Sequence, residues 1–259
     1  MKKCLKYIVL FSIVLFSFYL TERQAILNRS EDPIMKSILD CKDTYNSDAV
    51  NASIDDSHII PGLYGKRINE IKSLMRMKSG GAFNSLFLVT DYIKPDVSLE
   101  DNKDKIINKG NSSKKAISII LENDESNIVT YLISENIKAD ILVTKQSVNS
   151  NLKFEQINND FNNYHDVEKI LNKSKINKNI CIIGRSNKEF CQRNKKYLIE
   201  PTYVFSSNNL LSIKNKISSG DIILVKDSVS IDDISYIIKY IKTKGLSIIY
   251  LSELISEMQ

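Results

Sequence analysis

Short apolar segments alternate with amphipathic helical segments through the C-terminal half of this chain. The segments with strand-like composition are 116–121, 139–143, 179–183, 203–205, 221–225 and 247–251. Helical periodicity fills the intervals, over 127–136, part of 154–171, 188–195, 210–217 and 231–243. Strands separated by helices at this spacing are joined by crossover connections, which make neighbouring strands parallel. The sequence therefore predicts one α/β domain from Lys114 onward, and periodicity alone does not choose between an open sheet and a barrel.

The part of the chain before this domain is more polar and less periodic. Residues 22–57, rich in Asn, Asp and Ser, predict a stalk or linker with a short helix near 34–39. Turn signals at Pro61-Gly62, a helix over 68–78, a short strand over 86–89 and a surface loop over 102–113 follow. The 259 residues therefore divide into an N-terminal segment (1–21), a stalk (22–57), an additional region (58–112) and the α/β domain (113–259).

The N-terminal segment has the composition of a secretory signal. Lys2, Lys3 and Lys6 precede an uncharged, mostly apolar run from Tyr7 to Leu20. The residues that follow lack a small-x-small cleavage pattern, which favours an uncleaved signal anchor with the C-terminal domain outside the membrane. Cleavage of the signal would give a secreted protein instead. The alternative, a buried helix of a cytosolic domain, requires a polar face, and Ser12 and Ser17 alone do not form one.

Charge and cysteine content exclude several classes of function. The net charge of +5 is spread along the chain, and no basic run carries interleaved aromatic residues, so we expect no nucleic-acid partner. The four cysteines have no metal-ligand spacing. A Cys181–Cys191 disulfide suits an exported protein, and a pair of buried free thiols fits the sequence equally well. No glycine-rich phosphate loop and no Gly-x-Ser-x-Gly nucleophile motif is present.

Two stretches resemble the polysaccharide deacetylase family, which is carbohydrate esterase family four with its NodB-homology domain. The first runs Lys-Lys-Ala-Ile-Ser-Ile-Ile-Leu-Glu-Asn-Asp over 114–124 and continues to Thr144. The second includes Gly-Asp-Ile-Ile-Leu-Val-Lys-Asp over 220–227, a final helix and a closing Leu-Ser-Glu-Leu over 251–254. Together they cover about half of the domain, in the family's order. The resemblance implies an irregular (β/α) barrel with a groove at the C-terminal ends of its strands.

The reaction of that family implies residues that this chain lacks. One Asp of a double-Asp turn acts as the base, and the other binds a divalent metal with two histidines four residues apart. A further histidine protonates the departing amine. The mechanism therefore needs three imidazoles, whereas this sequence contains only His58, which we place in the stalk, and His165.

The corresponding positions show what has replaced these groups. One register places Glu122 and Asn123 at the double-Asp turn, and a shift by one residue places Asn123 and Asp124 there. Either way an amide replaces one carboxylate. Lys226 stands where the family has its last histidine, while Asp227 is kept. The resemblance thus indicates a degenerate, membrane-anchored member, for which we predict no catalytic residue, no metal ligand and no cofactor.

The predicted function is that of a pseudoenzyme, which binds cell-envelope polysaccharide, peptidoglycan or a partner protein through a vestigial groove. The groove residues would be Glu122, Asn123, Asp124, Lys226 and Asp227. An alternative is a divergent hydrolase that removes N- or O-acetyl groups from cell-wall polysaccharide with a carboxylate-only site. A third reading is a structural envelope protein, in which Asn and Asp of the turn cap the next helix and Lys226 and Asp227 are solvated.

Tyrosines are the remaining candidates for contact with sugars, because the chain contains no Trp. Aromatic faces can stack on pyranose rings, but most tyrosines in a domain of this size pack into the core. The candidates from the sequence are Tyr92, Tyr131, Tyr164, Tyr203 and Tyr250.

Overall fold

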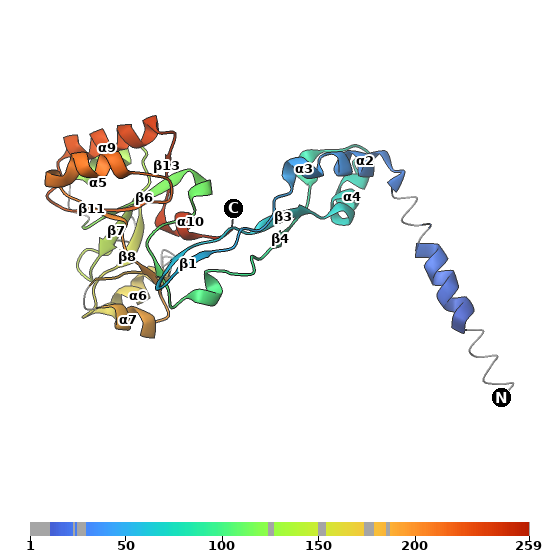
Figure 1. Cartoon of the computed structure of the whole chain (residues 1–259), viewed down its shortest axis with the longest axis horizontal. Helices are drawn as coiled ribbons and strands as arrows, with labels where there is room; N and C mark the ends of the chain where they lie inside the picture. Colours follow the sequence, from blue (N-terminus) through green and yellow to red (C-terminus); the bar gives the residue numbers. More distant parts are fainter. Residues whose placement is uncertain are drawn as a thin grey trace. The chain divides into compact units, whose positions relative to one another are not determined.

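The computed structural model of the chain describes residues 11–22, 24, 30–123, 127–149, 154–173, 179–184 and 187–258. The chain forms two compact units (Figure 1). The smaller unit comprises residues up to Ala49 together with Gly65–Ile93, and the larger unit comprises Val50–Tyr64 and Lys94–Gln259. Residues 11–22 are helical, and the remainder of the predicted anchor lies outside the described residues. Within the described part of the chain, no helix combines the length and the apolarity needed to cross a bilayer.

The smaller unit contains short helices and a two-stranded antiparallel sheet. Its elements are α2 (Pro33–Asp40), α3 (Lys42–Tyr45), β3 (Gly65–Ile68), α4 (Glu70–Lys78), η1 (Ser85–Phe87) and β4 (Thr90–Ile93). Side chains of Asp32 and Asn69 accept backbone N–H groups at the starts of α2 and α4, as helix caps do. The core of the unit consists of Met35, Ile38, Ile68, Leu74 and Met77.

The larger unit contains two sheets of mainly parallel strands. The first has the order β1 (Ser53–Asp55), β2 (His58–Ile60), β5 (Ile106–Ile107), β10 (Tyr197–Ile199), β9 (Ile180–Ile182). The second has the order β11 (Tyr203–Phe205), β12 (Ile222–Val225), β6 (Ala116–Leu121), β7 (Asp140–Val143), β8 (Glu155–Asn158), with β13 (Ser247–Ile248) beside β6. Every strand pair in these sheets is parallel except β1–β2. The predicted α/β class is therefore confirmed.

Helices cover the outer face of the second sheet. The helices of the unit are α5 (Asn127–Ser134), α6 (Tyr164–Lys173), α7 (Lys188–Arg193), α8 (Leu210–Lys216), α9 (Ile231–Thr243) and α10 (Leu251–Ile255), with 3-10 turns η2 (Glu100–Asn102), η3 (Ser112–Lys114) and η4 (Ser207–Asn209). The helices α5 and α9 contact each other (Figure 1). The strand β6 contributes to two buried clusters. The cluster covered by these helices contains Ile117, Ile119 and Leu121, and the second cluster contains Ala116 and Ile120. Because alternate residues face opposite sides of a strand, β6 is buried on both faces.

The boundaries of the two units differ from the domain boundaries predicted from the sequence. Residues 50–64, assigned to the stalk and the additional region, supply β1 and β2 of the larger unit. The segment 102–113, expected to be a surface loop, contains the buried strand β5. His58 therefore lies in a strand, and not in a stalk, with its Nε2 3.1 Å from Glu200 Oε2. These strands are only two or three residues long, too short for the hydrophobic pattern to reveal them.

Asp140, the first residue of β7, is a fully buried carboxylic acid that contacts the start of α10. Asp140 Oδ2 accepts hydrogen bonds from Ser118 Oγ at 3.1 Å and from the backbone N–H of Leu251 at 2.8 Å. Its Oδ1 is sealed from solvent and has no hydrogen-bond partner in the part of the chain that the structure describes. Asp140 stands opposite Glu155 in the register of β7 and β8. Burial raises the pKa of Asp140 well above its ordinary value, the charge of Glu155 adds to the rise, and the Leu251 hydrogen bond opposes it.

Asp140→Asn is expected to stabilise the protein at pH 7 by roughly 1 kcal/mol or more, because the amide keeps an acceptor oxygen without a buried charge. The folded state of the wild type binds its proton more tightly than the unfolded state does. This acid therefore favours folding below its unfolded pKa of about 4, and that contribution is lost as the pH rises through the folded pKa.

Urea unfolding between pH 4 and pH 8 measures this effect. The free energy of unfolding of Asp140→Asn should fall less with rising pH than that of the wild type. Asp104→Asn, at an exposed position, serves as the control and should follow the wild type. Parallel pH profiles for Asp140→Asn and the wild type would contradict the assignment.

Candidate functional site

Three predicted site residues meet at the carboxyl ends of two neighbouring strands. Leu121 of β6 pairs with Val225 of β12 in a parallel register, so the next residues, Glu122 and Lys226, lie beside each other. The backbone N–H of Glu122 donates to Val225 O at 3.1 Å and carries the pairing one residue further. Asp227 follows directly. The edge of the sheet thus places two carboxylates and one ammonium group together.

Lys226 forms an ion pair with Glu122, whereas the structural reading of the sequence left Lys226 and Asp227 as solvated side chains. Lys226 Nζ donates a hydrogen bond to Glu122 Oε1, and the backbone N–H of Asp227 donates to Glu122 Oε2 at 3.4 Å. The side chain of Lys226 is 39% exposed and that of Glu122 is 32% exposed. Both oxygens of Glu122 are therefore engaged by groups of the β12 end, in a half-buried ion pair.

The other predicted residues differ in their surroundings. Burial raises the pKa of Asp227, and the negative charge of Glu122 raises it further, while Lys226 lowers it. The side-chain oxygen Oδ1 of Asn123 is sealed from solvent and has no hydrogen-bond partner among the described residues. Asp124 lies outside the described residues. The structure thus groups Glu122, Lys226 and Asp227, with Asn123 next to them in the chain.

The divalent metal implied by the family resemblance does not fit the donors that the structure describes here. Among the described residues of the turn, the carboxylate of Glu122 already binds an ammonium group, and its neighbour Asn123 is an amide. His165 is exposed on α6 with its ring edge against Tyr164, and His58 pairs with Glu200. In the described part of the chain, no three His, Cys, Asp or Glu side chains are grouped for a metal. We therefore derive no chemical step through a metal ion.

The arrangement is suited to hydrogen bonding with a polar ligand. An ammonium group has three N–H donors, and Glu122 takes one of those of Lys226. The carboxylate of Asp227 can accept hydrogen bonds from hydroxyl groups. Donors and acceptors held by two strand ends can position a sugar, whereas Glu122, which binds Lys226, is not free to act as a general base.

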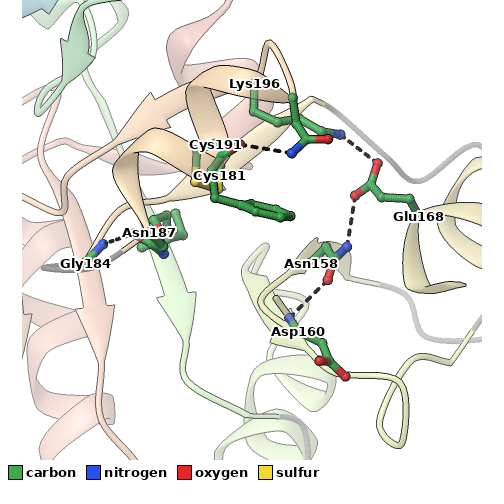
Figure 2. The surroundings of a disulfide bond; sticks show 11 residues. Asn158, Asp160, Glu168, Cys181, Gly184, Asn187, Cys191 and Lys196 are labelled. Atoms are coloured by element: carbon green, nitrogen blue, oxygen red, sulfur yellow. Dashed lines mark hydrogen bonds and ion pairs between the residues drawn. A yellow bond between two sulfur atoms is a disulfide. The ribbon is translucent and has the colours of Figure 1, made fainter. Parts of the chain in front are cut away.

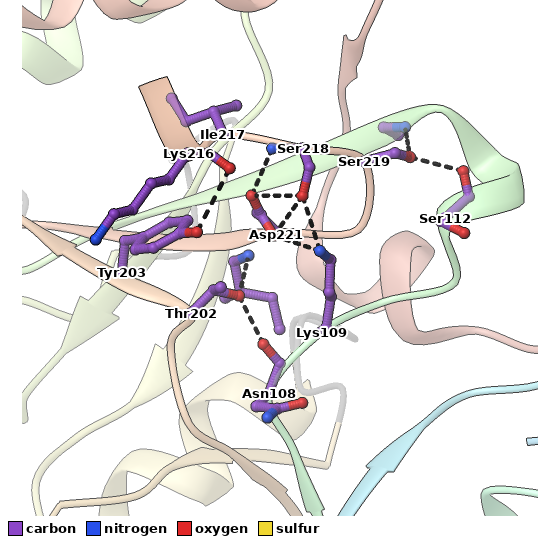
Figure 3. A network of polar contacts seen from close by, with 12 residues as sticks. Asn108, Lys109, Ser112, Thr202, Tyr203, Lys216, Ile217, Ser218, Ser219 and Asp221 are labelled. Atoms are coloured by element: carbon purple, nitrogen blue, oxygen red, sulfur yellow. Dashed lines mark hydrogen bonds and ion pairs between the residues drawn. The ribbon is translucent and has the colours of Figure 1, made fainter. Parts of the chain in front are cut away.

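A polar network fixes the amino end of β12 (Figure 3), whereas the site lies at the carboxyl end of that strand. Asp221 is fully buried and accepts a hydrogen bond from the backbone N–H of Ser218 at 2.6 Å, while Lys109 Nζ lies 3.1 Å from its Oδ1. Thr202 Oγ1 donates to Asn108 O at 2.6 Å and accepts the backbone N–H of Ile222 at 3.0 Å. These contacts tie the segment after β5 to the start of β12. The Gly-Asp pair that carries the family resemblance is therefore structural.

Gly220, the residue before Asp221, allows two backbone segments to approach closely. Its φ is +90°, in the region that favours glycine. The backbone N–H of Gly110 donates to Gly220 O, and that of Gly220 donates to Ala116 O, both at 2.7 Å. A Cβ at Gly220 would lie 2.3 Å from Gly110 O. The position therefore excludes side chains on both conformational and steric grounds.

A disulfide joins β9 to α7 (Figure 2). Cys181 and Cys191, which the sequence analysis left as either bonded or free, are bonded and fully buried. The loop after β9 is held by Asn187, whose side chain accepts the backbone N–H of Gly184 at 2.6 Å and donates to Ile182 O at 3.0 Å. The cross-link therefore fastens α7 to β9, the strand at the edge of the first sheet.

A buried ion pair lies near this disulfide (Figure 2). Lys196 Nζ donates to Glu168 Oε2 at 2.6 Å, and the two side chains are 6% and 13% exposed. Asn158 Nδ2 donates to Glu168 Oε1 at 3.2 Å. The ring of Tyr164 lies edge-on to Phe190, with centroids 4.8 Å apart. This cluster joins β8, α6 and α7.

Two tyrosines beside a cavity escaped the sequence analysis. Tyr64 and Tyr197 line a cavity with Glu257, whereas Tyr131, Tyr203 and Tyr250 pack against the core. A single tyrosine after a turn or at the start of a three-residue strand carries no pattern that marks it. The signal that could have pointed to them is spatial, because residues 64, 197 and 257 come together only in the fold.

Comparison with known proteins gives a match at the level of the fold. No family model matches the chain. The uncharacterised protein YlxY of Bacillus subtilis (strain 168) is 33% identical over 93 residues, which cover 36% of this chain and only 29% of YlxY. The wild-type structure of BA3943 from Bacillus anthracis, a CE4 family pseudoenzyme, has a TM-score of 0.60 and 18% identity, and covers 88% of this chain and 97% of that one. A BA3943 mutant with restored enzymatic activity has a TM-score of 0.59 and 18% identity, covering 87% and 99%. The chain therefore has the fold of CE4 polysaccharide deacetylases, the family that its sequence resembles.

Proposed function

We propose that this protein is a membrane-anchored, extracytoplasmic pseudoenzyme of the CE4 fold. It binds cell-envelope glycan through the groove edge formed by Glu122, Lys226 and Asp227. The ligand class is cell-wall polysaccharide or peptidoglycan, and a partner protein is the alternative occupant. Catalysis is absent, and the retained fold serves for binding.

The ion pair between Lys226 and Glu122 carries this proposal. Metal-dependent deacetylation requires a cation beside a carboxylate, with a second carboxylate free to accept a proton from water. Here a fixed ammonium group occupies the cation's position relative to Glu122. Lys226 would also repel a divalent ion at that position. The lysine at position 226 therefore prevents metal-dependent deacetylation, while hydrogen-bonding groups remain at the strand ends.

Several further observations support the proposal. BA3943, whose fold this chain shares, is itself a CE4 family pseudoenzyme. Buried disulfides such as Cys181–Cys191 are typical of proteins in oxidising compartments, which supports export. The basic and apolar composition of residues 1–20 supports a membrane anchor. The shared buried cluster of Ile107, Ile120 and Ile199, which joins strands of both sheets, supports an irregular barrel.

Replacing Lys226 by Met is expected to weaken binding to insoluble peptidoglycan at least about tenfold, since a hydrogen bond to a charged group contributes about 1.5–3 kcal/mol. Sedimentation of the purified full chain with peptidoglycan, followed by quantification of the bound fraction, measures this affinity. Lys239→Met on the exposed face of α9 is the matched control and should bind as the wild type does. Equal binding by Lys226→Met and the control would show that the groove edge does not bind peptidoglycan.

The hydrolase alternative predicts acetate release. We expect none above background from N-acetylated chitooligosaccharides or peptidoglycan, with Zn²⁺, Co²⁺ or Mn²⁺ supplied. Acetate release that Glu122→Gln abolishes would overturn the pseudoenzyme proposal. Absence of both acetate release and peptidoglycan binding would favour the structural role or a protein partner.

A further inference from the structure

A cavity of about 440 Å³ lies in the larger unit, beside the start of β10 and the end of α10. Its walls include Tyr64, Leu99, Glu100, Tyr197, Ile255 and Glu257. None of the residues Glu122, Asn123, Lys226 and Asp227 lines it. Its volume is in the range of small-molecule sites, which are mostly apolar with a few placed polar groups.

Glu257 gives the cavity a buried acceptor. The residue is 8% exposed, and its Oε1 accepts the backbone N–H groups of Gly62 and Leu99, both at 2.9 Å. Its carbonyl oxygen accepts the backbone N–H of Tyr64 at 2.7 Å. Oε2 accepts no hydrogen bond from the described residues, and it is not among the unpartnered atoms sealed from solvent. Because the described residues bind only Oε1 of Glu257, Oε2 can accept a hydrogen bond from a ligand.

Aromatic and apolar side chains form the rest of the walls. Tyr64 and Tyr197 are half-buried, and Leu99 and Ile255 are buried. Burial raises the pKa of Tyr197, and the charges of Glu100 and Glu257 raise it further, so its hydroxyl stays protonated and can donate. Phenol rings with polar tips suit ligands that have both apolar faces and hydroxyl groups.

Lysines around the cavity balance its acidic groups. Lys94 Nζ lies 2.8 Å from Asp101 and 3.9 Å from Glu100, and Lys103 Nζ lies 5.6 Å from the ring centroid of Tyr197. Lys114 Nζ donates to carbonyl oxygens at the end of α10, and burial lowers its pKa to about 8. Since cations already accompany these acids, a cationic ligand gains little from Coulomb attraction, and an uncharged ligand fits better.

We propose that this cavity is a second binding site, which takes an uncharged carbohydrate. Hydroxyl groups of the sugar donate to Glu257 Oε2 and Glu100, while a pyranose face packs on Tyr197 or Tyr64. The site shares no residue with the groove edge, so one chain would hold two glycan segments and bind a polymer more tightly than either site alone.

Calorimetric titration of the full chain with N-acetylchitotetraose tests this proposal. Tyr197→Leu and Glu100→Gln should each weaken binding at the second site at least fivefold, and Tyr197→Phe, which keeps the ring, should weaken it less. Glu100 is exposed, so its replacement by Gln is expected to leave the fold intact. Unchanged affinity for both Tyr197→Leu and Glu100→Gln would overturn the proposal.

Two further titrations separate this site from the groove and fix the ligand class. Lys226→Met should remove the groove's contribution and leave the binding that depends on Tyr197, so failure of one site is distinguishable from failure of the other. The de-N-acetylated tetrasaccharide at about pH 6, with its amines protonated, should bind more weakly than the acetylated form. Tighter binding of the cationic sugar would overturn the assignment to uncharged ligands.

Discussion

Replacing Gly220 by alanine is expected to destabilise the larger unit by at least about 3 kcal/mol. The new Cβ would meet backbone atoms, with Gly110 O at 2.3 Å and Gly110 C at 3.1 Å. Backbone atoms cannot move aside as the tip of a flexible side chain does. The φ of +90° adds conformational strain for any residue with a Cβ.

Relaxation around Gly220 would also break hydrogen bonds. Moving Gly110 away would lengthen its N–H bond to Gly220 O and disturb the link from Gly220 to Ala116 O. The same turn orders the buried carboxylate of Asp221. The clash is therefore relieved only by disrupting the start of β12 and its contact with β6.

Urea unfolding followed by circular dichroism measures this loss. Gly184→Ala is the control in the same unit, because the nearest atom to a Cβ there is Asn187 Oδ1 at 3.9 Å. We expect this control to change the free energy of unfolding by less than about 1 kcal/mol. Equal losses in the two variants would show that the close approach at Gly220 is not the cause.

Lys196→Met is expected to destabilise the protein by about 3–5 kcal/mol, because it removes the ammonium group that lies 2.6 Å from the nearly buried carboxylate of Glu168. The two side chains are nearly inaccessible to water, so solvent cannot replace the lost partner. Lys145→Met offers a matched control, because its partner Asp166 is about half exposed and an exposed pair contributes about 0–1 kcal/mol.

The double variant Lys196→Met with Glu168→Gln separates the two causes of destabilisation. If the cost comes from loss of the charge interaction between Lys196 and Glu168, the second substitution should recover a large part of the loss. Thermal and urea unfolding of the wild type, both single variants and the double variant give the coupling energy. Additive losses would instead indicate that Lys196 contributes mainly by packing.

The sequence predicts best where local signals agree with the tertiary environment. The helix predicted over 231–243 is observed as α9 with the same ends, because Ser230 caps its start and Gly245 adopts a positive φ after its end. The strands β6 and β12 are found at the predicted positions because their runs of Ile, Leu and Val suit strands buried on both faces.

The sequence fails where burial contradicts polarity. The helix predicted within 154–171 is observed as α6, but the strand β8 was not predicted, since its residues Glu155-Gln156-Ile157-Asn158 are mostly polar. Gln156 and Asn158 are nevertheless buried, where neighbours in the fold satisfy their amides. The run over 86–89, predicted as a buried strand, forms η1, in which Leu86 is 84% exposed. Tertiary contacts, which the local pattern does not contain, decide these segments.

The candidate site shows the same limit. Parallel neighbouring strands explain why Glu122 and Lys226 are close, and the sequence already placed both at strand ends. The pairing of their side chains, across 104 positions of the chain, depends on the register of β6 and β12. Register is a property of the folded sheet, so the sequence alone did not predict it.

The smaller unit is assembled from two separated stretches of chain, and this affects any proteolytic trimming. Met35 and Ile38 precede Val50, whereas Ile68, Leu74 and Met77 follow Gly65, and all five share one core. A protease that removed everything before Val50 would leave the later stretch attached and strip it of its apolar partners. Proteolytic removal of the amino-terminal region would therefore expose the apolar side chains of Ile68, Leu74 and Met77 on the remaining fragment. Exposed apolar surface makes a fragment prone to self-association or degradation.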